Sequence, residues 1–194
     1  TIPHVFKQLE QTGRLKNFEL ASPQGQGDFC SNYPFDDSDV YKAIEAASYS
    51  LMLHPDPELD KYLDQLIAKI AAAQEKDGYI YTARAIKDKG GEIPFKDWVA
   101  SKRWENEESS HELYNLGHLY EAAVAHYQAT GKKNLLKIAL KSADLILKDF
   151  GPGKLMVPPG HQEIEIGLVK LYCLTGAKKY LDQAKFFLDQ RGNS

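Results

Sequence analysis

Apolar residues recur every three or four positions along most of this chain, the spacing that predicts amphipathic helices. Segments rich in glycine and proline interrupt the pattern, and the loop over 21–36 is the first long one. A short helix is expected over 1–18, followed by six helices in three antiparallel pairs. Residues 79–109 are expected to be irregular, and a loop of that length is often functional. The six expected helices cover 38–53, 57–76, 110–130, 132–149, 161–175 and 177–190.

The helical pairs resemble one another in sequence. The letters Lys-Tyr-Leu-Asp-Gln at 61–65 recur at 179–183, and the Thr130-Gly131 turn recurs as Thr175-Gly176. Chance similarity between amphipathic helices is the alternative, but an internal helix-hairpin repeat is the simpler explanation.

The six helices also alternate in character. The second, fourth and sixth carry apolar residues on one face, whereas the first, third and fifth are apolar on nearly all sides. A helix that is apolar all round is expected to be buried all round. The alternation therefore predicts a toroid, in which an inner ring of helices is wrapped by an outer ring. A curved helical solenoid is the alternative.

Polar residues gather where the three inner helices are expected to begin. Because paired helices reverse direction, the inner helices point the same way and their N-terminal ends converge on one mouth. Backbone N–H groups at such ends favour oxygen-rich ligands. Within the helix expected over 110–130, His111, Asn115 and His118 fall on one face, although each could instead be an ordinary buried or capping residue. The candidate ligand-binding residues are His111, His161, Gln162, His118 and Asp37.

Composition and charge narrow the choice of partners. The chain has 194 residues, 24 Lys+Arg and 27 Asp+Glu, and a formal net charge of −3, so a nucleic-acid partner has no electrostatic support. The absence of a long apolar run argues against a membrane segment. Cys30 and Cys173 lie in no CxxC or Cys/His pattern, which argues against a disulfide scaffold and a standard zinc module within this chain. The start at Thr1 suggests a processed protein or a piece of a longer one, and leaves the compartment open.

Several of these segments together resemble one known family. The resemblance is to the bacterial beta-L-arabinofuranosidases, glycoside hydrolase family 127 and its close relatives, and it runs through nearly the whole chain in order. The segments that carry it are YPFDDSDVYK at 33–42 with IEAA at 44–47, AAQ at 72–74 with DGY at 77–79, SHELY at 110–114 with GHL at 117–119, GHQEIE at 160–165 and FFLDQRG at 186–192.

This resemblance implies an all-α fold of the (α/α)6-toroid type, with the sugar held at the N-terminal ends of the inner helices. It also implies a retaining exo-hydrolase that removes terminal L-arabinofuranose from plant glycans. In that family a glutamate acts as general acid/base and a zinc-bound cysteine thiolate as nucleophile. Those groups lie downstream of the part that this chain matches. Residues 1–194 are therefore expected to form one N-terminal segment, about half of the barrel in three helical hairpins, with no catalytic residue or zinc ligand of their own and no activity alone.

The resemblance also assigns roles to individual residues. It implies that His111 and His161 hold the arabinose hydroxyls, because an imidazole can donate at one ring nitrogen and accept at the other. Gln162, His118 and Asp37 are the further candidates. Trp104 could offer a surface for sugar stacking, although an aromatic residue in a half-buried loop more often serves packing.

Two alternative functions remain open at this point. One is a metal-independent sugar epimerase or unsaturated-uronide hydrolase on the same fold, and the other is a non-enzymatic helical-repeat module that binds a peptide or glycan. Whichever holds, the open edges of a half barrel would expose apolar surface, so self-association or an unusually open structure is expected.

Overall fold

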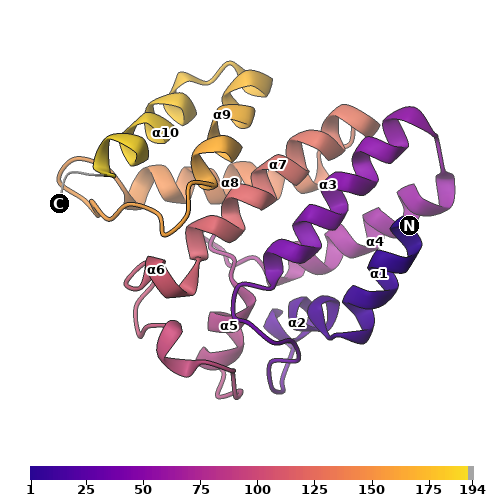
Figure 1. Ribbon diagram of the computed structural model, residues 1–194, viewed down its shortest axis with the longest axis horizontal. Helices are drawn as coiled ribbons and strands as arrows, with labels where there is room; N and C mark the ends of the chain where they lie inside the picture. Colours follow the sequence, from indigo (N-terminus) through magenta and orange to yellow (C-terminus); the bar gives the residue numbers. More distant parts are fainter. Residues whose placement is uncertain (192–194) are drawn as a thin grey trace.

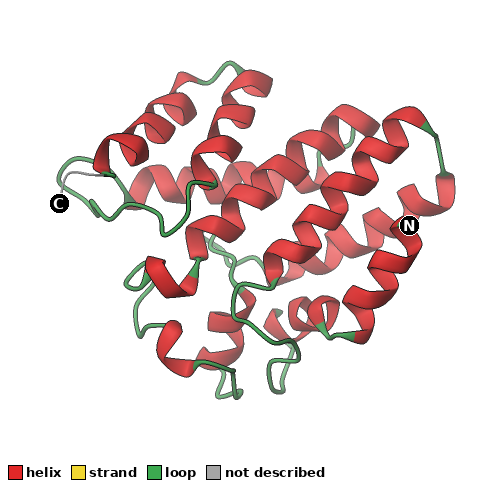
Figure 2. Ribbon diagram, in the orientation of Figure 1, coloured by secondary structure: helices red, strands yellow, loops and turns green. Residues whose placement is uncertain are grey.

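A computed structural model describes residues 1–191, and helices dominate it (Figure 2). In this part of the chain there are ten α-helices, one short 3-10 helix and no strand, apart from an isolated bridge between Phe150 and Leu155. The helices are α1 Ile2–Gln11, α2 Arg14–Ala21, α3 Asp37–Leu53, α4 Pro57–Ala73, α5 Thr82–Asp88, η1 Lys96–Trp98, α6 Glu107–Ser110, α7 Glu112–Thr130, α8 Asn134–Asp149, α9 Ile164–Thr175 and α10 Lys178–Gln190.

Three helices form the inner layer that the sequence predicts. Helix α7 packs against α3 on one side and α9 on the other, and all three run in the same direction (Figure 1). Helices α4 and α8 lie between the inner helices in the chain, α10 follows α9, and in the outer layer α8 packs against both α4 and α10. This arrangement confirms three helical hairpins with alternating inner and outer helices. It also brings the starts of α3, α7 and α9 to the same end of the layer.

The repeated Thr-Gly turns have the same structure at both sites. Thr130 donates its hydroxyl to the carbonyl of His126 at 2.7 Å and accepts the backbone N–H of Lys132 at 3.1 Å. Thr175 makes the equivalent pair of bonds, at 2.7 and 3.2 Å. The glycine that follows each threonine has a φ of 71° and ends the helix in the left-handed conformation. The internal repeat is thus a structural repeat.

Two glycines allow α7 and α9 to approach closely. A Cβ on Gly117 would lie 2.6 Å from the carbonyl of Glu163, and one on Gly167 would lie 2.6 Å from the carbonyl oxygen of Gly117. Neither space would admit a larger side chain. The backbones of α7 and α9 therefore touch near their N-terminal ends, where the candidate residues are.

The structure differs from the predicted elements at the N-terminus and in the long loop. The helix expected over 1–18 is broken at Gly13, whose φ of 78° suits glycine and where a Cβ would lie 2.4 Å from the Cβ of Cys30. The stretch expected to be irregular over 79–109 contains α5, η1 and α6. Helix α5 packs against α2, so its formation depends on a distant segment that local sequence does not reveal.

The expectation that every inner helix is buried all round is wrong for the C-terminal part of α3, where Tyr49, Met52 and Leu53 are exposed, and for α9. Ile166 and Val169 are 48% and 38% exposed, and Cys173 is exposed beside them. The reason is that α9 contacts α7 and α10 but leaves its remaining face open. Among the residues that the structure describes, no helix is long and apolar enough to cross a membrane.

Candidate functional site

The start of α3 carries Asp37, which is only 2% exposed. Its carboxylate accepts the backbone N–H of Thr82 at 2.9 Å and the Thr82 hydroxyl at 2.5 Å. Burial raises the pKa of Asp37 to about 7, although the bonds from Thr82 oppose the rise. Asp37 therefore links the start of α3 to the start of α5. Its hydrogen bonds go to Thr82 and not to the histidines.

His111 lies between α6 and α7 and not inside a helix. Its φ of 58° is left-handed, which is uncommon for any residue other than glycine. The prediction that His111, Asn115 and His118 share one helix face is therefore wrong for His111. Asn115 is also buried, and its side-chain oxygen accepts the backbone N–H of Ser38 at 3.1 Å. It links the starts of α3 and α7 instead of facing a ligand.

Two buried carboxyl groups hold the bend at His111. Glu107 accepts the backbone N–H of Leu113 at 3.0 Å, and Glu112 accepts from the Ser110 hydroxyl at 3.2 Å. Glu112 also accepts the hydroxyl of Tyr79. Both acids are at most 2% exposed, and burial raises the pKa of each. These acids fasten the segments on either side of the bend and thereby fix where His111 stands.

Trp104 belongs to this buried framework. It is 3% exposed, its indole N–H donates to Asp149 at 2.9 Å, and its ring meets Tyr79 and Phe150 edge to face. Packing is therefore its role, and the sugar-stacking alternative has no exposed ring face to rest on.

The side chain of His111 is fixed from two directions. Its Nδ1 lies 2.9 Å from the carbonyl oxygen of Ser109, and its ring lies against Phe35 with centroids 4.6 Å apart. Because a carbonyl can only accept, Nδ1 carries the proton and Nε2 keeps a lone pair. Burial lowers the pKa of His111, which favours this neutral form.

His161 reaches the same place from the loop before α9. Its ring centroid lies 4.8 Å from that of His111 and 5.4 Å from that of Tyr114. Tyr114 in turn meets His118 edge to face at 4.6 Å and accepts a hydrogen bond from Lys42 at 2.7 Å. We call His111, Tyr114, His118 and His161 the histidine cluster. It joins two inner helices, and sequence reasoning missed Tyr114 within it.

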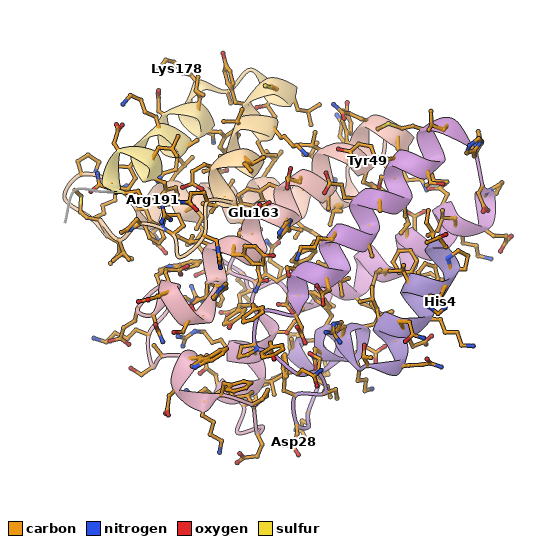
Figure 3. All side chains as sticks on the ribbon, viewed as in Figure 1. His4, Asp28, Tyr49, Glu163, Lys178 and Arg191 are labelled. Carbon is orange, nitrogen blue, oxygen red and sulfur yellow. The ribbon has the colours of Figure 1, made fainter. Side chains whose placement is uncertain are left out.

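Gln162 is exposed beside the cluster and is tied to the end of α10. With its amide oxygen turned towards Arg191, it accepts from Nε at 3.0 Å and from Nη1 at 3.3 Å. Arg191 also donates to the carbonyl of Pro159. Figure 3 labels Arg191 and Glu163, which lie on either side of this segment. Gln162 is thus held by the guanidinium while the adjacent His161 faces the cluster.

Behind His118 lies a compact charged group. His118 Nδ1 is 3.1 Å from Glu163 and 3.7 Å from Glu121, and Lys170 contacts Glu121 and, at 3.0 Å, Glu45. Burial raises the pKa of Glu163 to about 8, and the neighbouring Glu121 adds to the rise. Burial lowers the pKa of His118 to about 4. At neutral pH Glu163 therefore holds a proton and His118 is uncharged.

An aromatic surface adjoins the histidine cluster, and sequence reasoning missed it. The rings of Tyr33 and Phe35 stack at 5.3 Å, and those of Phe95 and Trp98 at 4.3 Å. Tyr33 and Phe95 are 43% and 48% exposed. The sequence shows these aromatic residues as two separate groups, one in the segment at 33–35 and one in the long loop. Only the packing of the folded chain shows that the two groups form one surface.

The two cysteines take no part in this site. Cys30 and Cys173 are free and exposed, and neither joins a group of metal-ligating side chains among residues 1–191. The described residues therefore do not fit a zinc–thiolate centre.

Comparisons with known proteins identify the family of this chain. The family model for the beta-L-arabinofuranosidase GH127 catalytic domain matches residues 1–194. A non-reducing end beta-L-arabinofuranosidase of Bifidobacterium longum subsp. longum is 44% identical over 180 residues, which are 92% of this chain and 26% of that enzyme.

Two solved structures are also similar over almost the whole chain. The GH127 beta-arabinofuranosidase BT3674 superposes with a TM-score of 0.91 at 51% identity, covering 100% of this chain and 30% of that one. Ara127N-Se, a GH127 beta-L-arabinofuranosidase from Geobacillus stearothermophilus T6, gives 0.89 at 40% identity, covering 98% and 30%. The chain thus spans less than a third of the length of these relatives.

Proposed function

Since this chain belongs to the GH127 beta-L-arabinofuranosidase family, we propose that the whole protein is a glycoside hydrolase that releases terminal L-arabinofuranose from plant glycans. We propose further that it is exo-acting and retains the anomeric configuration. This chain supplies part of the sugar-binding mouth. The observation that carries the proposal is the pairing of His111 and His161, with ring centroids 4.8 Å apart, where two inner helices begin.

The two histidines suit neighbouring hydroxyl groups on one sugar ring. His111 offers Nε2 as an acceptor, because Nδ1 donates to the Ser109 carbonyl. His161 is exposed, so its ring can reach a second hydroxyl of the same ligand. Neutral imidazoles can each donate or accept with a hydroxyl, which fits an uncharged furanose.

The remaining candidates act around these two. His118 orients Tyr114 from one side, and Lys42 holds the Tyr114 hydroxyl from the other. Gln162 lies next to His161 and is available once Arg191 is displaced. Asp37 stabilises the start of α3 by hydrogen bonds to Thr82 at the start of α5.

The aromatic surface offers a place for the group attached to the arabinose. Phe35 lies against His111, Tyr33 stacks on Phe35, and Phe95 stacks on Tyr33. The aromatic surface therefore extends away from the proposed sugar contact at His111. Exposed aromatic rings bind the apolar faces of sugars well.

The catalytic glutamate and the zinc-bound thiolate expected for the family are proposed to come from parts of the protein outside this chain. Among the described residues, neither cysteine joins a group of potential metal ligands. Family membership favours the hydrolase over the metal-independent epimerase or uronide hydrolase and over a non-enzymatic binding module.

The test is hydrolysis of p-nitrophenyl beta-L-arabinofuranoside by the full-length protein, with and without a zinc chelator. The substitution His161→Ala removes a proposed hydroxyl contact, and we expect kcat/KM to fall about tenfold to a hundredfold. His54→Ala, an exposed histidine at the far end of α3, is the control and should leave kcat/KM unchanged. Equal activity of both variants would contradict the assignment, and turnover by the 194-residue chain alone would place catalysis within it.

A further inference from the structure

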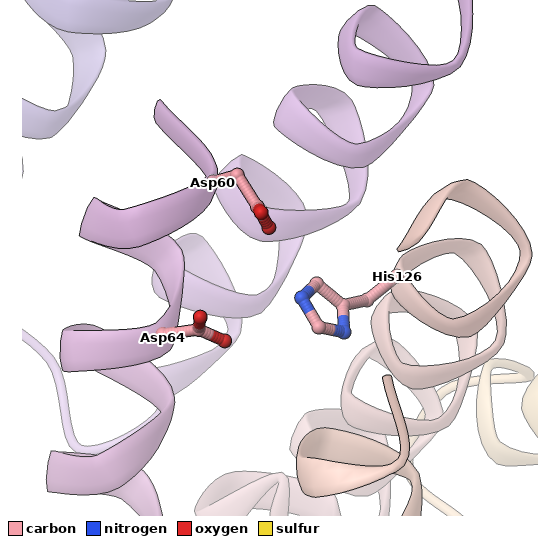
Figure 4. A group of neighbouring side chains, drawn as sticks. All are labelled: Asp60, Asp64 and His126. Carbon is pink, nitrogen blue, oxygen red and sulfur yellow. The ribbon is translucent and has the colours of Figure 1, made fainter. Parts of the chain in front are cut away.

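A second group of potential ligands lies away from the histidine cluster, between the outer helix α4 and the C-terminal part of α7. Asp60 and Asp64 are one turn apart on α4, so both carboxylates project from the same face. His126 faces them from α7 (Figure 4). One oxygen of each carboxylate and one ring nitrogen all lie within 4.8 Å of one another. We call these three residues the α4–α7 cluster.

His126 is the unusual member of this cluster. Its side chain is 0% exposed, and neither ring nitrogen has a hydrogen-bond partner among residues 1–191. A buried polar group without a partner costs about 1–3 kcal/mol, so such groups ask for an explanation. Burial lowers the pKa of His126 even though Asp64 opposes the change. The neutral form of the imidazole is therefore favoured, and in it one ring nitrogen keeps a lone pair that a metal ion can bind.

The two carboxylates already hold a cation. Lys132 Nζ lies 2.7 Å from an oxygen of Asp60 and 2.7 Å from an oxygen of Asp64. Burial alone would raise the pKa of Asp64, but Lys132 and Asn134 hold it below its ordinary value. One ammonium between two carboxylates leaves a net negative charge. The side chain of Lys132 is 35% exposed, so it can swing into water when another cation takes its place.

An entry route for such a cation adjoins the cluster. A cavity of about 280 Å³ lies between the end of α3 and the start of α4, and Asp60 lines it together with Thr130. Water and an ion can therefore reach Asp60 from the cavity, and the Asp64 side chain is itself 41% exposed.

We propose that Asp60, Asp64 and His126 form a binding site for a divalent transition-metal ion, with Zn²⁺ as the ion of choice, which displaces the ammonium of Lys132. An imidazole with two carboxylates suits Zn²⁺ or Mn²⁺ better than Ca²⁺ or Mg²⁺, which prefer oxygen ligands alone. Zinc bonds of about 2.0–2.2 Å require small side-chain rotations from the present separations. Three protein ligands leave a fourth position open for water.

The bound ion would tie the outer layer to the inner layer, because α4 supplies two ligands and α7 the third. It would also give a partner to one of the two unpaired ring nitrogens of His126. This site contains no cysteine and lies near the opposite end of α7 from His111. It stands or falls independently of the proposed hydrolase activity.

The first test measures Zn²⁺ binding to the 194-residue chain by isothermal titration calorimetry. We expect one tight site per chain. Asp64→Asn removes a ligand but keeps the shape of the side chain, and it should weaken this site at least about tenfold. Lys132→Ala removes the competing cation and should tighten the site about tenfold or more. The matched control Lys133→Ala changes the exposed neighbouring lysine and should have no effect.

The Lys132→Ala result separates a metal site from a simple ion-pair network. A network alone would lose stability in this variant and gain no metal affinity, and that outcome would overturn the proposal. Glu163→Gln disrupts the other potential metal group, formed by His118, Glu121 and Glu163. Loss of the tight site in Glu163→Gln, with Asp64→Asn unaffected, would likewise place the ion elsewhere.

A second measurement identifies the ligands directly. Co²⁺ in place of Zn²⁺ should give visible absorption bands without the near-ultraviolet charge-transfer band of a thiolate, because Cys30 and Cys173 are not ligands. The bands should disappear in Asp64→Asn, whose fold is checked by circular dichroism. Zn²⁺ should also raise the melting temperature of the wild-type chain and not that of Asp64→Asn. A thiolate band at the tight site, or visible bands that survive in Asp64→Asn, would refute the assignment.

Discussion

The rings of His111 and His161 lie 4.8 Å apart, although the chain forms the whole of α7 and α8 between them. Helix α8 returns the chain to the end of the molecule where α7 began, and α9 then starts beside α7. Gly117 and Gly167 let the two helices touch near these starts. The site is therefore assembled by helix packing, so changes in packing should change sugar binding.

Replacing His111 should separate stability from function. Its φ of 58° suits glycine, so His111→Gly should change the free energy of unfolding by less than about 1 kcal/mol while arabinose binding is lost. His111→Val should cost more than about 1 kcal/mol, because a β-branched residue tolerates this conformation poorly. Urea unfolding and ligand titration of both variants provide the check. A valine variant as stable as the glycine variant would show that the bend is not strained.

Glu163 should make stability depend on pH. Its folded pKa of about 8 lies above the ordinary value of 4.5, so between these values the folded chain keeps a proton that the unfolded chain releases. Stability from this group is fully present below pH 4.5 and is lost as the pH rises through 8. Glu163→Gln cannot ionise, so its stability relative to wild type should increase from pH 5 to pH 9.

Urea unfolding at pH 5, 7 and 9 measures this difference. Glu108→Gln, a change at an exposed acid elsewhere, is the control. A constant difference between Glu163→Gln and wild type across the three pH values would mean that Glu163 ionises normally in the folded chain.

Gly167→Ala should disturb both the fold and the site. Its Cβ would lie 2.6 Å from the carbonyl oxygen of Gly117 and 2.9 Å from the Cβ of Tyr120, so α9 must move away from α7. Such overpacking costs about 1–3 kcal/mol, and the same shift should separate His161 from His111 and weaken sugar binding. Thermal unfolding and ligand titration test this. Val169→Ala, on the exposed face of α9, should leave both nearly unchanged; similar losses in the two variants would argue against a role for the close contact.

The open face of α9 should drive self-association of this chain. Ile166 and Val169 are exposed side by side on one helix, and contiguous apolar surface promotes association. Sedimentation velocity of the wild type should show oligomers at high concentration, and Ile166→Lys with Val169→Lys should reduce them. Leu155→Lys changes an exposed apolar residue in a loop and serves as the control. A wild-type chain that remains monomeric would contradict the prediction.

The sequence predicts the hairpins well because their signals are local. Asp56 accepts the backbone N–H groups of Glu58 and Leu59, both at 3.1 Å, and Pro57 begins α4 as expected for a capped helix start. The glycine after each Thr-Gly turn ends its helix in the same way. Such features depend on neighbours a few residues away, and the expected ends of these helices agree with the structure to within a few residues.

The details of the candidate site depend on distant contacts, and the sequence does not reveal them. The bend at His111 is held by buried Glu107 and Glu112, the second of which binds Tyr79 from another segment. From sequence alone, an acid in a polar stretch is normally interpreted as exposed, so Glu107 and Glu112 gave no sign of a bend. The expected helix therefore included His111, whereas α7 begins at Glu112. Tyr114 was likewise missed, because only the approach of α9 shows that it lies between His118 and His161.

The buried acids beneath the histidine cluster also bear on ligand selection. Burial opposes negative charge on Glu107 and Glu112, and it favours uncharged forms of Glu163, His111 and His118. The imidazoles of the histidine cluster therefore present dipoles to a ligand, with the cations of Lys42 and Arg191 beside them. Dipoles discriminate by direction, and added salt screens them little compared with charge–charge attraction. Binding of the proposed neutral pentose through these imidazoles should therefore depend little on ionic strength.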